Sequence, residues 1–146
     1  MRFAADAALV LALCAIVFVT LRPFDADNDL ELVPFADLAD GIVHRDAGSL
    51  REAVVGAVGN VLLFVPLGAA LALRGASLRL GAGVALLVSG SVELAQLVVP
   101  GRTTAVDDVV LNVAGAAVGL ALTKAWLRRS RVSGARSMQP RPARRP

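Results

Sequence analysis

The sequence predicts an all-α integral membrane protein, a four-helix transmembrane bundle with a disordered basic C-terminal tail. Two observations lead to this fold class. Hydrophobic residues make up 56% of the 146 residues and the mean hydropathy is +0.67, so too few polar residues remain to cover a small soluble domain. They also fall in four long runs, and a bilayer core of ~30 Å is crossed by ~20 helical residues. We expect residues 1–127 to form one membrane domain and residues 128–146 to form the tail.

The first expected helix covers residues 3–21, where Asp6 is the only charged residue. A cleaved signal peptide is the alternative, because Arg2 precedes an apolar stretch. No small-x-small cleavage site follows, since the run ends in VTLRPF. We therefore expect a retained transmembrane helix. Cys14, the only cysteine, cannot form an intrachain disulfide and is predicted to be an apolar filler.

Residues 22–52 form an acidic connection with eight carboxylates against three arginines. Within it, Leu32, Phe35, Leu38 and Ile42 recur at roughly helical spacing. This spacing is compatible either with a short amphipathic helix on the outer surface or with a plain loop. The only histidine, His44, lies in the same connection. Because no second nitrogen or sulfur ligand lies nearby, we expect no metal site there.

The second expected helix contains the uncharged run 53–73, opened by a capping box at Ser49–Glu52. Pro66 lies well inside this run, where its ring removes an amide and displaces the carbonyl of Leu62, so a kink is predicted.

The third expected helix covers residues 80–99, with Glu93 as its only charged residue. The fourth covers about 106–126 and opens with a second capping box, at Thr104–Asp107. It contains the motif Gly115-x-x-x-Gly119, which allows close backbone approach between membrane helices. That approach can be within the chain or between two copies, so a homo-oligomer is compatible with the sequence.

The distribution of Lys and Arg predicts the topology, because cytoplasmic loops carry an excess of both. Residues from Lys124 onward contain eight of the fifteen basic residues and no acid, and the turn at 74–79 contains two more. A multi-pass protein of the plasma membrane with both termini in the cytoplasm satisfies this pattern. The tail contains no aromatics for stacking on bases, so we interpret it as a topology signal that attracts anionic lipids, with no nucleic-acid partner.

Polar residues inside the apolar runs identify the candidate site. Counted at the helical rise, Asn60 lies ~10 Å, Glu93 ~9 Å, Asn112 ~7 Å and Gln96 ~5 Å from the outer surface. Buried polar groups of this kind turn inward and find partners. The predicted binding residues, with no catalytic and no metal-ligating residue among them, are Asn60, Glu93, Gln96, Arg102, Asp107, Asp108 and Asn112.

We expect Glu93 to bond Asn60, Gln96, Asn112 or Arg102. The alternative is that these polar residues only join the helices, at ~0.6 kcal/mol per hydrogen bond. An ionisable glutamate, two aspartates and an arginine at one depth favour a site.

At these residues the chain resembles the VanZ-like family of small bacterial membrane proteins, over about residues 32–122. The matching segments are NVLLFVPLG, SVELAQ and GRTTAVDDVVLNVAG, which occur in this order on the second, third and fourth helices. The family is named for a protein associated with low-level resistance to the glycopeptide teicoplanin. The resemblance therefore implies a membrane protein with a role in the cell envelope or the antibiotic response, and no defined reaction.

Three functions fit the sequence. The first is binding of a lipid-linked or amphiphilic envelope molecule in an outward-facing polar pocket, with charge from Glu93, Asp108 and Arg102. The second is a structural or accessory role, in which the polar residues only fix helix packing. The third is an enzyme acting on a lipid headgroup, with Glu93 and Asp108 as an acid/base pair or, together with Asp107, as ligands of a divalent cation. One His and one Cys provide no nucleophile pair, so we rank the enzyme last and expect no cofactor.

Overall fold

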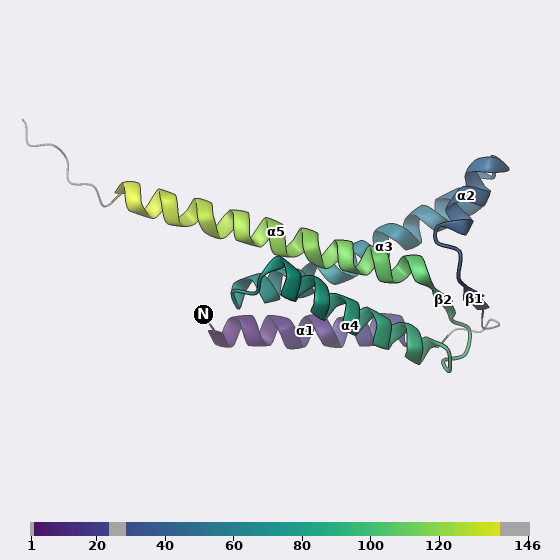
Figure 1. The fold of residues 1–146 in the computed structure, drawn as a ribbon, viewed down its shortest axis with the longest axis horizontal. Helices are drawn as coiled ribbons and strands as arrows, with labels where there is room; N and C mark the ends of the chain where they lie inside the picture. Colours follow the sequence, from purple (N-terminus) through teal and green to yellow (C-terminus); the bar gives the residue numbers. More distant parts are fainter. Residues whose placement is uncertain (1, 24–28, 138–146) are drawn as a thin grey trace, which may run out of the picture.

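The computed structural model describes residues 2–23 and 29–137 and contains four helices long and apolar enough to cross a membrane. The predicted fold class is therefore confirmed. These helices are α1 (Arg2–Thr20), α3 (Ala47–Leu73), α4 (Leu78–Gln96) and α5 (Val106–Ser137). They alternate in direction along the bundle (Figure 1).

Two short strands and a short helix lie at one end of the bundle, which we call the strand end (Figure 1). The start of α1 and the far end of α5 lie at the opposite end. Strand β1 (Asp29–Glu31) pairs in parallel with β2 (Thr103–Ala105), with Leu30 opposite Thr104. This pairing was not predicted from the sequence. It joins the connection that follows α1 to the connection that precedes α5.

The short helix α2 (Ala36–Val43) confirms the helical alternative for the acidic connection. It begins after Phe35, whose backbone is left-handed with φ of 59°. The helix packs closely on the start of α3, because a Cβ added at Gly41 would lie 2.9 Å from the backbone nitrogen of Leu50.

Both predicted capping boxes are wrong. At the start of α3 the cap is Asp46, whose carboxylate accepts hydrogen bonds from the Ser49 hydroxyl at 2.5 Å and the Gly48 amide at 3.0 Å. These bonds hold the pKa of Asp46 below its ordinary value. Before α5, Thr104 belongs to β2, and its buried hydroxyl has no hydrogen-bond partner among the described residues. Helix α5 begins only at Val106, so Ala105 and not Thr104 directly precedes it.

The core of the bundle is built around α3 and α5. A Cβ added at Gly115 or Gly119 of α5 would overlap the carbonyl oxygen of Val61 or Val65 on α3. The two helices therefore touch backbone to backbone, and the glycine motif packs within the chain. Around this contact lies a cluster of buried apolar side chains from four helices, including Ile16, Phe64, Leu67, Ala85, Val92 and Ala116.

Two features of the long helices bear on the predictions. Helix α3 is continuous from Ala47 to Leu73 with Pro66 inside it. Helix α5 runs to Ser137, so residues 128–137, predicted to belong to a disordered tail, are helical. The physical reason is that this segment lacks proline and is rich in arginine, which tolerates a helix well. The rest of the predicted tail, 138–146, lies outside the described residues.

Candidate functional site

Polar side chains are buried at the strand end of the bundle. Glu93 and Gln96 of α4 are 7% and 5% exposed, and Asn112 of α5 is 2% exposed. Ser89, one turn before Glu93, is also buried. Ser89, Glu93 and Gln96 are spaced four and three residues apart, so they share one face of α4. That face is turned to the interior, as polar groups in a membrane helix require.

The Glu93 carboxylate holds the segment that leads into α5. Its Oε2 atom accepts a hydrogen bond of 3.1 Å from the backbone amide of Ala105, the last residue of β2. Asp108 and Asp107, in the first turn of α5, lie close enough to act electrostatically on this carboxylate. Glu93 thus faces two further acids in a partly dehydrated region.

The hydrogen bonds described for the four residues predicted as partners of Glu93 go to other groups. Asn60 donates through Nδ2 to Oδ1 of Asp108, which links α3 to α5. Asn112 donates through Nδ2 to the Ser89 hydroxyl at 2.9 Å, which links α5 to α4. Both bonds join helices across the bundle.

The other two predicted partners, Gln96 and Arg102, bind the end of α1. Gln96 donates through Nε2 to the carbonyl of Thr20 at 3.0 Å. Arg102 donates through Nη2 to the carbonyl of Val19 at 2.5 Å and through Nε to that of Arg22 at 3.0 Å. Carbonyls at a helix end have no partner within the helix, so side chains that bind them fix that end in place.

Arg102 brings a positive charge to this point. Its guanidinium is partly buried, which lowers the pKa of Arg102, while the Asp108 carboxylate opposes the change. Arginine remains protonated in proteins. The carbonyl oxygens of Val19 and Arg22 orient the guanidinium, and the Asp108 carboxylate acts on its charge electrostatically.

A groove of about 930 Å³ runs between α1 and α3, which we call the α1–α3 groove. Most of its wall is apolar, with small residues such as Ala12 on α1 and Gly59 on α3. Its polar lining consists of Thr20, Asn60, Gln96 and Arg102. Because Thr20, Gln96 and Arg102 meet at the end of α1, the groove has one polar end, and that end lies at the strand end of the bundle.

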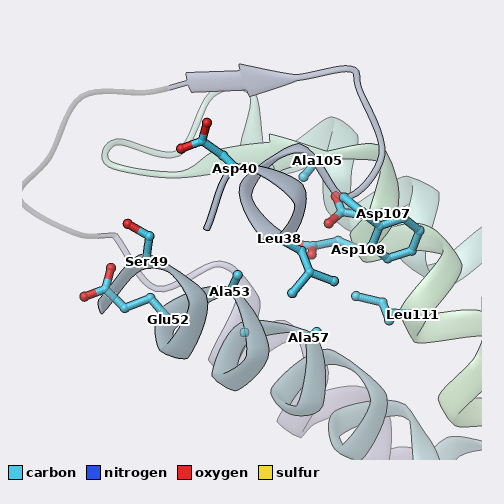
Figure 2. Close-up of a pocket in the computed structure, with 12 residues that line it drawn as sticks. Leu38, Asp40, Ser49, Glu52, Ala53, Ala57, Ala105, Asp107, Asp108 and Leu111 are labelled. Atoms are coloured by element: carbon cyan, nitrogen blue, oxygen red, sulfur yellow. The ribbon is translucent and has the colours of Figure 1, made fainter. Parts of the chain in front are cut away.

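A second pocket, of about 460 Å³, lies between α2, α3 and α5. It is lined by four carboxylates, those of Asp40, Glu52, Asp107 and Asp108. Figure 2 shows Asp107 and Asp108 beside Leu38, with Asp40 and Glu52 well separated from them. The carboxylates do not converge, and no group of three His, Cys, Asp or Glu in the described part of the chain is placed to hold a metal ion.

The seven predicted residues therefore gather at one end of the bundle without sharing one pocket. Asn60, Gln96 and Arg102 line the α1–α3 groove, and Asp107 and Asp108 line the acidic pocket. Glu93 borders a third depression, of about 590 Å³, along α4. Asn112 lies in the interior, bonded to Ser89.

The first helix was missing from the predicted site. It supplies Thr20 and the row Ala8, Ala12 and Ala15, which lines the groove. The spacing of these alanines, four and three residues apart, was visible in the sequence and indicated a smooth helix face. It did not indicate which helix that face would meet.

Residues 7–128 of this chain match the sequence model of the VanZ/LLP1 family. The match includes most of α1 as well as the later helices, so it is longer than the resemblance noted in the sequence. No curated protein and no solved structure matches the chain.

Proposed function

The chain belongs to the VanZ/LLP1 family, and from this premise we propose that it is an envelope membrane protein that binds a lipid-linked or amphiphilic molecule. The site is the strand end of the bundle, where polar groups border an apolar groove. The family supplies the membrane context, and the proposed ligand follows from the chemistry of the residues.

One observation supports binding over packing alone. Gln96 is 5% exposed and donates to Thr20, yet its Oε1 atom has no hydrogen-bond partner among the described residues. A buried acceptor without a donor costs ~1–3 kcal/mol. Other atoms of Gln96 line the α1–α3 groove, so a turn of its side chain would bring the buried Oε1 atom to the groove. A hydroxyl or amide of a bound molecule can then supply the missing donor while its apolar part lies along the groove.

The orientation of the site is part of the proposal. Arg79, Lys124, Arg128 and Arg129 belong to the end of the bundle opposite the strands. Cytoplasmic segments carry an excess of Lys and Arg, which supports a cytoplasmic location for that end and an outer location for the strand end. The polar end of the groove then opens at the outer leaflet, where envelope precursors and external amphiphiles arrive.

Purely structural use of the polar residues is the second candidate. The Asn60–Asp108 and Asn112–Ser89 bonds favour it, because each joins two helices inside the bundle. Such bonds stabilise membrane proteins without any ligand.

The two candidates differ in what copurifies with the protein. The experiment is mass spectrometry of lipids and small molecules extracted from the purified wild type, Gln96→Leu and Asn112→Ala. Binding predicts a molecule that is retained by the wild type and by Asn112→Ala, whose residue is buried away from the groove, and lost from Gln96→Leu. The proposal is wrong if the wild type retains nothing, or if all three proteins retain the same molecules.

We also propose a role in the response to lipophilic glycopeptide antibiotics or to envelope stress, because such antibiotics are themselves amphiphiles. Expression of the wild type is expected to change the growth of a bacterial host in the presence of teicoplanin. Gln96→Leu, at equal abundance in the membrane, is expected to have no effect. Equal growth of both strains and of the empty host would contradict this role.

A further inference from the structure

We propose that the α1–α3 groove seats one hydrocarbon chain of an outer-leaflet lipid whose phosphate group lies at Arg102. This inference rests on the proposed function and narrows it to one ligand class and one place. Three properties of the groove support it: its open space, its length and the charge at its polar end.

The open space is maintained by glycine. Among the described residues, no neighbouring atom lies within 4 Å of a Cβ built at Gly56 or Gly59 on α3. The glycines of α5 behave in the opposite way, because a Cβ at Gly115 or Gly119 would overlap α3. Small residues therefore bring α3 and α5 together, whereas on the other side of α3 they leave room for an occupant.

The first helix is fastened at both ends while its middle borders this space. At the strand end, Gln96 and Arg102 bind its last carbonyls. Near its start, Asp6 forms an ion pair with Arg74 at 2.8 Å. An occupant of the groove can therefore contact α1 without displacing it.

The length of the groove fits one leaflet. On α1 its lining runs from Ala8 to Thr20, which corresponds to about 18 Å at the helical rise. This is slightly more than half of a hydrocarbon core of ~30 Å. The volume of about 930 Å³ falls in the range of small-molecule sites, roughly 300–1,000 Å³. A chain that enters from the outer surface and stays within one leaflet fits both dimensions.

The polar end selects the headgroup. Backbone carbonyls orient the Arg102 guanidinium, with the Asp108 carboxylate close enough to act on its charge. A guanidinium is the group best suited to bind a phosphate through paired hydrogen bonds. Gln96 lies in the same lining, and its Oε1 atom, a buried acceptor with no partner among the described residues, suits a hydroxyl next to the phosphate when the side chain turns toward the groove. A lipid with a phosphate and a hydroxyl-bearing headgroup therefore matches the charge and the hydrogen-bonding groups at this end.

The experiment is a native mass spectrometry titration of the delipidated full-length protein in detergent micelles. The two probes are phosphatidylglycerol and a diacylglycerol with the same acyl chains, which lacks the phosphate. The variants are Gly59→Leu, which fills the groove, and Arg102→Gln, which removes its charge. Gly83→Leu is the matched control, because Gly83 also has open space at its Cβ and lies on α4, outside the groove lining.

The wild type and Gly83→Leu are expected to bind one phosphatidylglycerol per chain, about tenfold more tightly than diacylglycerol, the effect of a charge-assisted hydrogen bond. Arg102→Gln is expected to bind the two lipids equally, and Gly59→Leu to bind neither. The inference is wrong if Gly59→Leu binds phosphatidylglycerol like the wild type, or if the wild type does not distinguish the two lipids. If the wild type retains a ligand that depends on Gln96 while Gly59→Leu also retains it, the inference fails and the proposed function stands.

Discussion

At the scale of single residues, Glu93 connects the fold to the candidate site. Its carboxylate accepts a hydrogen bond from the amide of Ala105, and Ala105 lies three residues after Arg102. Glu93 does not line the α1–α3 groove. We therefore interpret it as a positioning residue, which holds the connection that carries Arg102.

The change Glu93→Gln tests whether the ionised group is needed. We predict that the variant inserts and accumulates like the wild type but loses its copurifying molecule. The reason is that a neutral amide at this position no longer has the charge on which the Asp107 and Asp108 carboxylates act. Lipid extraction with mass spectrometry measures this, together with the amount of protein in the membrane. Glu52→Gln, an exposed carboxylate outside the groove, is the matched control. Normal ligand content in Glu93→Gln would leave Glu93 a purely structural role.

The burial of Glu93 could be predicted from sequence, whereas its partner could not. Ser89, Glu93 and Gln96 fall on one stripe of a helix, and a charge in an apolar run must turn inward. The donor on Ala105, however, is presented by a strand that pairs with residues 29–31, more than seventy positions earlier. Local spacing contains no information about such a contact, so nearby polar side chains, three amides and the Arg102 guanidinium, were predicted in its place.

At the scale of secondary-structure elements, the glycines of α3 and α5 have opposite roles. We predict that Gly115→Ala and Gly119→Ala each lower the free energy of unfolding by ~1–3 kcal/mol or more, because the added methyl group overlaps the backbone of α3. Gly56→Ala and Gly59→Ala are expected to raise it by roughly 0.5–1 kcal/mol through helix propensity, since the methyl group enters open space.

Unfolding in detergent micelles by titration with a denaturing detergent, followed by circular dichroism, measures all four variants. Equal losses of stability in both pairs would contradict the assignment of an open groove beside α3. Losses of less than ~0.5 kcal/mol for Gly115→Ala and Gly119→Ala would contradict the close contact between α3 and α5.

The membrane helices followed directly from the sequence because length and hydropathy alone decide whether a helix can cross a bilayer. The helix ends did not follow, since Asp46 replaced Ser49 as a cap and Thr104 joined a strand. The two kinds of glycine pair also look alike in sequence. Which pair meets a neighbouring backbone depends on how the helices are arranged, and that information is tertiary.

At the scale of the whole molecule, the distribution of basic residues and the arrangement of the helices both distinguish the two ends of the bundle. Figure 1 places the start of α1 and the far end of α5 at one end, with the strands at the other. We predict that a reporter active only in the cytoplasm is active when fused after Pro146 or inserted at 74–79. The same reporter inserted near Asp27 is expected to be inactive, because the excess of basic residues keeps the end of the bundle opposite the strands in the cytoplasm. The reverse pattern of activity would invert the site and place the groove opening in the inner leaflet.

The central claim, that a lipid chain occupies the α1–α3 groove, is tested most directly by photo-crosslinking in vesicles with a phosphatidylglycerol that carries a diazirine in its acyl chain. Peptide mapping should locate the crosslinks on residues 8–15 of α1 and 55–63 of α3, and Gly59→Leu should abolish them while Gly83→Leu should not. The claim would be contradicted if the crosslinks instead followed simple exposure to lipid and were unchanged in Gly59→Leu. They would then be strongest at Leu87 and Leu94 of α4, which are 73% and 71% exposed.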